Sequence, residues 1–172
     1  MRWGLVPSWA KDLSIGNKMI NARADTLTEK ASFKRLIGKR RCLIVADGFY
    51  EWRAEGGEKI PYYIQLKSKK LFGFAGLYDH WQSPEAGELT TCTIITTDAN
   101  EFMQKIHSRM PVILTDEERD GWLDPSIKDQ SYFLEMLKPY DGEGIKAHAV
   151  SKLVNSPHNN SPKLILPGTP SS

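Results

Sequence analysis

The chain has 172 residues, of which 40% are hydrophobic and 26% charged, and its formal net charge is +2. This length suffices for one hydrophobic core, so we expect a single domain over residues 1–172. No apolar run approaches the roughly 20 residues that a membrane-spanning helix needs, and the mild charge alone does not indicate a polyanionic partner. Cys42 and Cys92 lie in apolar, β-branched runs. This favours buried thiols in a cytoplasmic protein over a disulfide or a metal site.

The first half of the chain is dominated by strand patterns. Residues 1–9 begin with apolar and aromatic side chains and no polar lead-in, which predicts a strand that pairs with sequence preceding the chain. Residues 29–37 have helical spacing of apolar positions between Thr28 and the stop signal Gly38. Runs rich in β-branched and aromatic residues then predict strands at 41–46, 49–54, 61–66, 71–81 and 89–97.

The second half mixes short helices with a last strand. Thr115 and Glu118 form a capping-box pattern for a helix that ends near Leu123. Further helices are expected at 99–105 and 130–137, and a strand at 145–150, followed by a polar loop at 155–162. Consecutive strands with short turns imply antiparallel pairing. We therefore predict an α+β fold on a curved, barrel-like, mainly antiparallel sheet with short peripheral helices.

Glu51 is the first candidate for chemistry. It stands between Tyr50 and Trp52 at the end of an apolar run, where a carboxylate costs free energy unless it is partnered or its pKa is raised. Gly48 allows a bend that re-aims the following side chains. The alternative is that strand alternation turns Glu51 outward to solvent.

Two other polar groups accompany it. Asn21 and Arg23 are two residues apart, so both point to one side of an extended segment, where Arg23 can grip a phosphate or form a surface salt bridge. His107 and Arg109 lie in a loop between a predicted helix and a strand, where an imidazole serves either chemistry or local structure. Together they resemble an acid/base and anion-binding site that lacks a nucleophile.

Several motifs carry a resemblance to a known family. They are Trp-Gly-Leu-Val-Pro-Ser-Trp at 3–9, Asn-Ala-Arg at 21–23, Asp-Gly-Phe-Tyr-Glu-Trp at 47–52 and Ile-His-Ser-Arg-Met-Pro at 106–111. In their order and spacing they are similar to the SOS-response-associated peptidase (SRAP) family, over essentially the whole chain. The resemblance implies a DNA-repair protein that recognises abasic sites in single-stranded DNA and links itself to them covalently, with associated self-cleavage of its N-terminus.

The resemblance also implies roles for individual residues. Asn21 would orient the nucleophile, Glu51 would be the acid/base group, and His107 would stabilise or protonate the opened sugar. Four residues would contact DNA: Arg23, Arg109, Trp3 and Trp9. A monomer without cofactor or metal is expected, nucleoid-associated when bound to DNA.

The sequence departs from the family at its start. The family's nucleophile is a cysteine directly after the initiator Met, whose amine and thiol close a thiazolidine on the sugar aldehyde, whereas position 2 is Arg2. As written, the chain should not form this ring, and we expect that a preceding segment is missing. A non-covalent DNA-binding module, a weak Schiff-base lyase acting through the Met1 amine, and a hydrolase using Asp47 with Glu51 remain alternatives. The binding module would use five cations: Arg23, Arg109, Lys30, Lys34 and Arg35.

Overall fold

The computed structural model describes residues 1–68, 70–83 and 87–168. Its contacts divide the chain into two compact units. The first comprises Met1–Val45, Phe72–Asp98 and Pro111–Pro139, and the second comprises Ala46–Leu71, Ala99–Met110 and Tyr140–Ser172. Each unit is built from segments far apart in sequence. The assignment of residues 1–172 to one domain stays a prediction.

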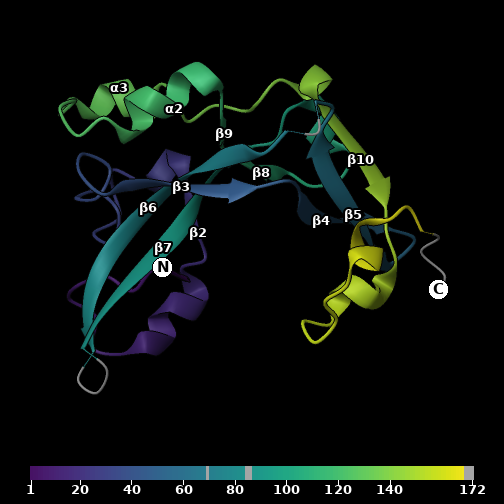
Figure 1. Cartoon of the computed structure of the whole chain (residues 1–172), viewed down its shortest axis with the longest axis horizontal. Coiled ribbons are helices and arrows are strands. Elements are labelled where there is room, and N and C mark those ends of the chain that lie inside the picture. Colours follow the sequence, from purple (N-terminus) through teal and green to yellow (C-terminus); the bar gives the residue numbers. More distant parts are fainter. Residues whose placement is uncertain (69, 84–86, 169–172) are drawn as a thin grey trace. The chain divides into compact units, whose positions relative to one another are not determined.

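The sheet of the first unit is centred on a long hairpin. Strands β6 (Phe72–Ser83) and β7 (Gly87–Asp98) pair antiparallel (Figure 1). The predicted strands at 71–81 and 89–97 are confirmed, and both extend further toward the turn between them, whose residues 84–86 lie outside the described residues. The sheet continues on the other side of β6 with β3 (Arg41–Ala46), whose bounds match the prediction. The short strand β9 (Ile113–Leu114) also pairs with β6.

The second edge of β7 holds two short parallel strands. These are β1 (Arg2–Trp3) and β2 (Asn21–Arg23), and they follow one another along β7, opposite Thr91–Cys92 and Ile94–Thr96. The N-terminal strand was expected to need a partner from outside the chain, but its partner is β7. Parallel pairing here also departs from the antiparallel pairing inferred from short turns, because β1 and β2 reach β7 through longer connections.

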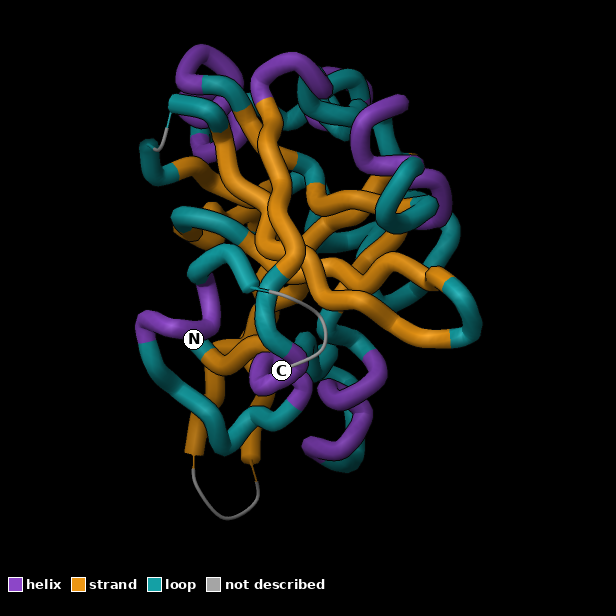
Figure 2. The backbone as a smooth tube through the Cα atoms, turned by 90° about the vertical axis from the view of Figure 1, so that its right-hand side faces the viewer, coloured by secondary structure: helices purple, strands orange, loops and turns teal. Residues whose placement is uncertain are grey.

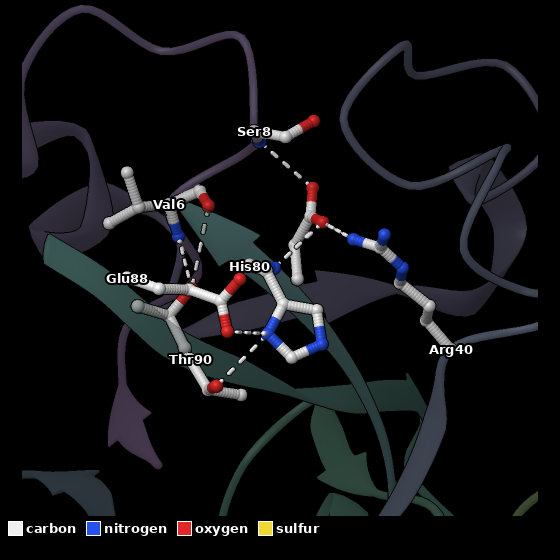
Figure 3. A network of polar contacts seen from close by, with 8 residues as sticks. Val6, Ser8, Arg40, His80, Glu88 and Thr90 are labelled. Carbon is white, nitrogen blue, oxygen red and sulfur yellow. Dashed lines mark hydrogen bonds and ion pairs between the residues drawn. The ribbon is translucent and has the colours of Figure 1, made fainter. Parts of the chain in front are cut away.

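Polar contacts fix the N-terminal segment to this hairpin (Figure 3). The Val6 N–H donates to Thr91 Oγ1 at 2.8 Å, and the Ser8 N–H donates to Asp79 Oδ2 at 2.9 Å. Asp79 is 3% exposed and also forms an ion pair with Arg40. A buried carboxylate is stable only with such partners. The segment that carries Trp3 and Trp9 is therefore tied to the sheet.

The core of the first unit lies between the sheet and the segments that follow it. It contains Leu5, Ala22, Leu27, Phe33, Leu36, Ile37, Ala75, Leu77, Ile95, Val112, Leu114, Trp122, Phe133, Met136 and Leu137. Helix α2 (Asp116–Leu123) begins with the predicted capping box, in which the Thr115 side chain accepts from the Glu118 N–H. Helix α3 (Gln130–Leu134) is shorter than predicted and contributes Phe133. The 3₁₀ segments η1 (Leu13–Lys18) and η2 (Ala24–Thr26) flank β2.

The predicted helix at 29–37 is wrong. Residues 28–39 form successive turns instead, closed by bonds such as Lys34 N–H to Lys30 O at 3.0 Å and Leu36 N–H to Phe33 O at 2.8 Å. Of the four apolar positions in this stretch, Phe33, Leu36 and Ile37 are nevertheless buried, while Ala31 is exposed. Burial of these side chains does not require the regular bonding of an α-helix, so the apolar pattern correctly indicated the core but not the backbone.

The second unit has its own antiparallel sheet, ordered β10-β5-β4. Its strands are β4 (Phe49–Glu55), β5 (Glu58–Leu66) and β10 (Ile145–Ala149), close to the predicted bounds. Gly56 and Gly57 take positive φ in the turn between β4 and β5, where L-residues are disfavoured. A turn begins after β5 with Lys67 and Ser68, and Lys69 lies outside the described residues.

The helical segments of the second unit are short, and Figure 2 draws all the described helices of the chain in purple. They are α1 (Glu101–Gln104), η3 (Gly142–Gly144), η4 (Lys152–Asn155) and η5 (Pro162–Ile165). Strand β8 (Arg109–Pro111) spans the point where the sequence passes from the second unit to the first. The loop predicted over residues 155–162 is confirmed between η4 and η5.

The α+β class is confirmed, with mostly strands and a few short helices. The barrel-like closure is not found: within residues 1–68, 70–83 and 87–168 neither sheet closes on itself. Cys42 and Cys92 are buried and unbridged, as predicted. The described helices include none with the length and apolar character needed to cross a membrane.

Candidate active site

Glu51 lies in the middle of β4, opposite Tyr62 of β5. Its side chain is 23% exposed, so it is neither in bulk solvent nor sealed in the core. Burial raises its pKa above the ordinary value, while the positive charge of His107 and a backbone hydrogen bond from Trp52 act in the opposite direction. The outward-facing alternative is therefore wrong. Glu51 is a partly desolvated carboxyl group whose proton is held more tightly than usual.

His107 is placed by the short helix before it. Asn100 caps α1 by accepting from the Met103 N–H at 2.8 Å, and its side-chain amide donates to the Tyr140 carbonyl at 2.7 Å. The His107 N–H then donates to Met103 O at 2.8 Å. The loop that follows α1 is thus fixed at its first turn. This puts His107 Nδ1 at 3.8 Å from Glu51 Oε2.

The imidazole has a second set of contacts through the same atom. Nδ1 of His107 lies 3.1 Å from both the N–H and the carbonyl oxygen of Arg109. Unprotonated Nδ1 accepts from that N–H, whereas protonated Nδ1 can donate to the carbonyl or face the Glu51 carboxylate. The pair can therefore exist in two protonation states. In one, Glu51 is a neutral carboxylic acid and His107 a neutral imidazole; in the other, Glu51 is a carboxylate and His107 an imidazolium. Such a pair can pass a proton to and from a bound molecule.

The pair opens onto a concavity of about 760 Å³ in the second unit. Its lining includes Glu51, Trp52, Arg53, Ala54, Lys59, Gln104, Lys105, Ile106, His107, Ser108 and Asn155. Trp52 is held by a hydrogen bond from its Nε1–H to Asn155 Oδ1 at 2.8 Å. Because Arg53 pairs with Glu55, the amines of Lys59 and Lys105 are the simplest partners for an anion here.

Sequence reasoning missed part of this lining. Lys59, Lys105 and Asn155 were not singled out, and the bond from Trp52 to Asn155 joins residues 103 positions apart. No local pattern indicates such a contact.

The first unit brings three other predicted residues together. Trp3 ends β1 opposite Cys92, and Asn21 begins β2 opposite Ile94, so the two lie about 7 Å apart along β7. The Trp3 Nε1–H donates to Ile20 O at 2.8 Å, which joins the two strands. Asn21 and Arg23 are exposed on either side of buried Ala22, as their spacing predicted.

Arg23 was predicted either to bind a phosphate or to form a surface salt bridge, and in the structure it forms a salt bridge with Asp25. Its Nε and Nη2 atoms donate to the two carboxylate oxygens of Asp25 at 3.1 and 2.7 Å. More than half of both side chains is exposed, so the pair is weak and its guanidinium can exchange partners. A DNA phosphate can therefore compete for Arg23.

Trp9 and Arg109 are the remaining residues that were predicted to contact DNA. Trp9 is 52% exposed on a turn closed by the Ala10 N–H donating to Pro7 O at 2.9 Å. The residue after Trp9 is also fixed, because the Trp81 Nε1–H donates to the Ala10 carbonyl oxygen at 2.7 Å. Arg109 is partly buried and contacts His107 through its backbone. The DNA-binding roles of both residues stay predictions.

Neither cysteine suits nucleophilic chemistry. Burial raises the pKa of the Cys42 thiol to about 12, and burial also raises that of Cys92, so both remain protonated near neutral pH. Asp47, the other half of the carboxylate-pair alternative, raises the pKa of Tyr50 and Tyr63 together with burial. It therefore has tyrosine neighbours, while Glu51 faces His107. No cluster able to hold a metal ion is found among the residues that the structure describes.

Comparisons with known proteins agree on one family. The family model described as SOS response associated peptidase (SRAP) matches residues 1–157. Abasic site processing protein YoqW of Bacillus subtilis is 58% identical over 166 residues, covering 96% of this chain and 74% of that protein. Abasic site processing protein HMCES of Gallus gallus is 40% identical, over 97% of this chain and 56% of that protein.

A solved structure supports the same relationship. A Bacteroides thetaiotaomicron protein has a TM-score of 0.89 and 41% sequence identity, covering 97% of this chain and 75% of its own. This similarity extends over both open sheets and the segments that carry Glu51, His107, Asn21 and Arg23. The chain belongs to the SRAP family.

Proposed function

We propose that this protein processes abasic sites in single-stranded DNA by forming a covalent bond with the sugar aldehyde. The observation that carries the proposal is the Glu51–His107 pair, 3.8 Å apart at an open concavity. The names of the relatives YoqW and HMCES as abasic site processing proteins support the same substrate. An abasic sugar in its open form presents an aldehyde, and condensation with an amine needs protons to be moved in both directions.

The reaction has two proton-dependent stages. An N-terminal amine adds to the aldehyde carbon, and loss of water from the carbinolamine gives an imine. In the family's chemistry the thiol beside that amine then adds to the imine carbon and closes a thiazolidine ring. Glu51 as carboxylate removes the proton from the attacking nitrogen, and as carboxylic acid it returns that proton to the departing hydroxyl group. A raised pKa suits this dual role near neutral pH.

His107 and the residues of the first unit take complementary roles. Protonated His107 donates to the ring oxygen of the sugar as it opens, and Glu51 stabilises that protonated state. Asn21 orients the N-terminal nucleophile, Arg23 holds a phosphate, and Trp3 with Trp9 provides exposed aromatic surface. Stacked bases and neutralised phosphates are the usual means of binding single strands. Arg109 is assigned to the DNA backbone.

The test is intact mass spectrometry of the natively expressed protein after incubation with an abasic single-stranded oligonucleotide. It reports the true N-terminus, any self-cleavage, and any adduct that survives denaturation. A parallel reaction with cyanoborohydride traps an imine that does not proceed further. An adduct in wild type that is strongly reduced in Glu51→Gln is expected. Salt-dependent binding with no adduct in either reaction would overturn the proposal in favour of a non-covalent binding module.

A further inference from the structure

A basic patch lies on the first unit, on the turns that were expected to be a helix. It consists of Lys34, Arg35, Lys39 and Lys128, which line an open concavity of about 690 Å³. A smaller hollow of about 140 Å³ shares Arg35 and Lys39 with it, so the two hollows are adjacent. All four side chains belong to exposed residues.

No carboxylate lines the larger hollow. Within the described ranges 1–68, 70–83 and 87–168, Lys34, Arg35 and Lys39 form no ion pair. The chain as a whole has 23 basic and 21 acidic residues, so interspersed charges would have offered partners. Grouped cations repel one another, and that repulsion is relieved when an anion binds.

Carboxylates near the patch include Asp79 and Asp124, and Asp124 interacts electrostatically with Lys128. Asp79 lines the smaller hollow but is 3% exposed, and it accepts from the Ser8 and His80 N–H groups while pairing with Arg40 (Figure 3). Its charge is thereby compensated from within the protein. It leaves Arg35 and Lys39 available to an external anion.

The backbone beneath the patch is held in place. Phe33, Leu36 and Ile37 are buried between the basic positions, and the Lys39 N–H donates to Leu36 O at 3.0 Å. The cations therefore project from an anchored segment. Lys128 belongs to the segment between α2 and α3. Its ammonium donates to the Pro125 carbonyl and retains further N–H donors.

The shape favours a chain of phosphates over a compact anion, because four cations are spread around an open depression. Thr28 of the patch rim is five residues from Arg23, so the two are at most about 18 Å apart along the chain. At the roughly 3.4 Å rise of a stacked strand this corresponds to about five nucleotides. We propose that the basic patch binds the phosphodiester backbone of DNA flanking the abasic nucleotide, beyond the phosphate that Arg23 holds. This inference rests on the proposed function, which supplies the DNA strand.

The test measures how the affinity for DNA depends on strand length and on the charges of the patch. Dye-labelled single strands of 7 and 25 nucleotides, each with a central tetrahydrofuran abasic analogue, are titrated by fluorescence anisotropy at several salt concentrations. The patch variant is Lys34→Gln/Arg35→Gln/Lys39→Gln. The matched control is Lys18→Gln/Lys67→Gln/Lys163→Gln, which removes the same charge at exposed positions elsewhere.

We expect the patch variant to bind the 25-mer about tenfold to a hundredfold more weakly at 0.1 M salt, with a salt slope smaller by about 2. Its affinity for the 7-mer should fall by less, since three flanking nucleotides on either side offer the patch fewer phosphates. The Lys34→Arg/Lys39→Arg variant should retain binding. Equal losses in the patch and control variants, or equal losses on both strands, would overturn the proposal.

The outcome is separable from that of the proposed function. Wild type that binds long strands through the patch but neither prefers nor links abasic strands would contradict only the proposed function. Wild type that links abasic strands, with the patch variant indistinguishable from the control, would contradict only the patch. Circular dichroism melting of each variant checks that the folds are equally stable.

Discussion

The concavity of the second unit and the β1/β2 surface of the first unit differ in how far their charged side chains are exposed to solvent. Glu51 is 23% exposed and shares its environment with His107, whereas Arg23 is 57% exposed and pairs with a solvent-facing Asp25. Desolvation shifts the pKa of the carboxyl group, as proton transfer requires. Exposure keeps the guanidinium available for phosphates but gives it no chemical role. Substitutions in the two regions should therefore affect different steps.

Glu51→Gln should produce the largest effect. Removing the proton-exchanging group while keeping its shape should slow covalent product formation at saturating DNA by about 10²-fold to 10⁴-fold. Affinity for the abasic analogue should change by less than about twofold, because the side chain provides little binding. Single-turnover kinetics on denaturing gels and anisotropy titrations measure the two quantities. A parallel loss of affinity would erase the distinction between the two regions.

His107→Asn should have the next largest effect. Asparagine retains a polar contact in the loop but cannot hold an additional proton, so the rate should fall by about tenfold to a hundredfold. The pKa of Glu51 should also rise further, since the imidazolium charge lowers it in wild type. Carbon-13 NMR of labelled glutamate, with Glu51→Gln to assign the signal, measures that change. An unchanged Glu51 titration would show that the pair is not electrostatically linked.

Arg23→Gln should act in the opposite manner to Glu51→Gln. Loss of one phosphate contact should weaken binding by about fivefold at 0.1 M salt and lower the salt slope by about 0.7. The rate at saturating DNA should stay within about twofold. Asp25→Asn is the matched variant: it frees the guanidinium and should leave binding equal or tighter. Slower chemistry at saturation in Arg23→Gln would place this residue in the reaction itself.

The smallest effect concerns stability and pH. Because folding raises the pKa of Glu51, its contribution favours the fold at low pH and is lost as pH rises through the folded pKa. Glu51→Gln should therefore be more stable than wild type at pH 8, by on the order of 1 kcal/mol or about 2–4 °C, and the difference should disappear toward pH 4. Thermal melts at both pH values measure it, with exposed Glu29→Gln as control. A difference that is the same at both pH values would contradict the desolvation of Glu51.

Local patterns predicted some parts of the molecule well. The apolar run at Arg41–Ala46 and the Thr115–Glu118 capping box appear as expected, because both depend on neighbouring residues only. The helix at 29–37 was wrong, since burial of Phe33 and Leu36 is satisfied by turns. The pairing of β1 and β2 with β7 depends on contacts about 70 to 90 residues away, which no local pattern contains.

The candidate site shows the same division. The aromatic neighbours of Glu51 predicted that its charge would cost free energy, and the partial burial of its side chain agrees with that prediction. Its partner His107 is 56 positions away in sequence, and only the motif pattern suggested that they belong together. Lys59, Lys105 and Asn155 carry no local signal of chemistry. Lys59 is brought near Glu51 by the pairing of β5 with β4, whereas Lys105 and Asn155 come from the end of α1 and from η4.

The most direct measurement is the pH dependence of covalent product formation at saturating abasic DNA, compared between wild type and Glu51→Gln. The proposed role of Glu51 predicts that wild type shows an ionisation above the ordinary glutamate range and that this ionisation disappears in the variant along with most of the rate. The same pH profile in both proteins, at similar rates, would show that Glu51 does not exchange the protons of the reaction.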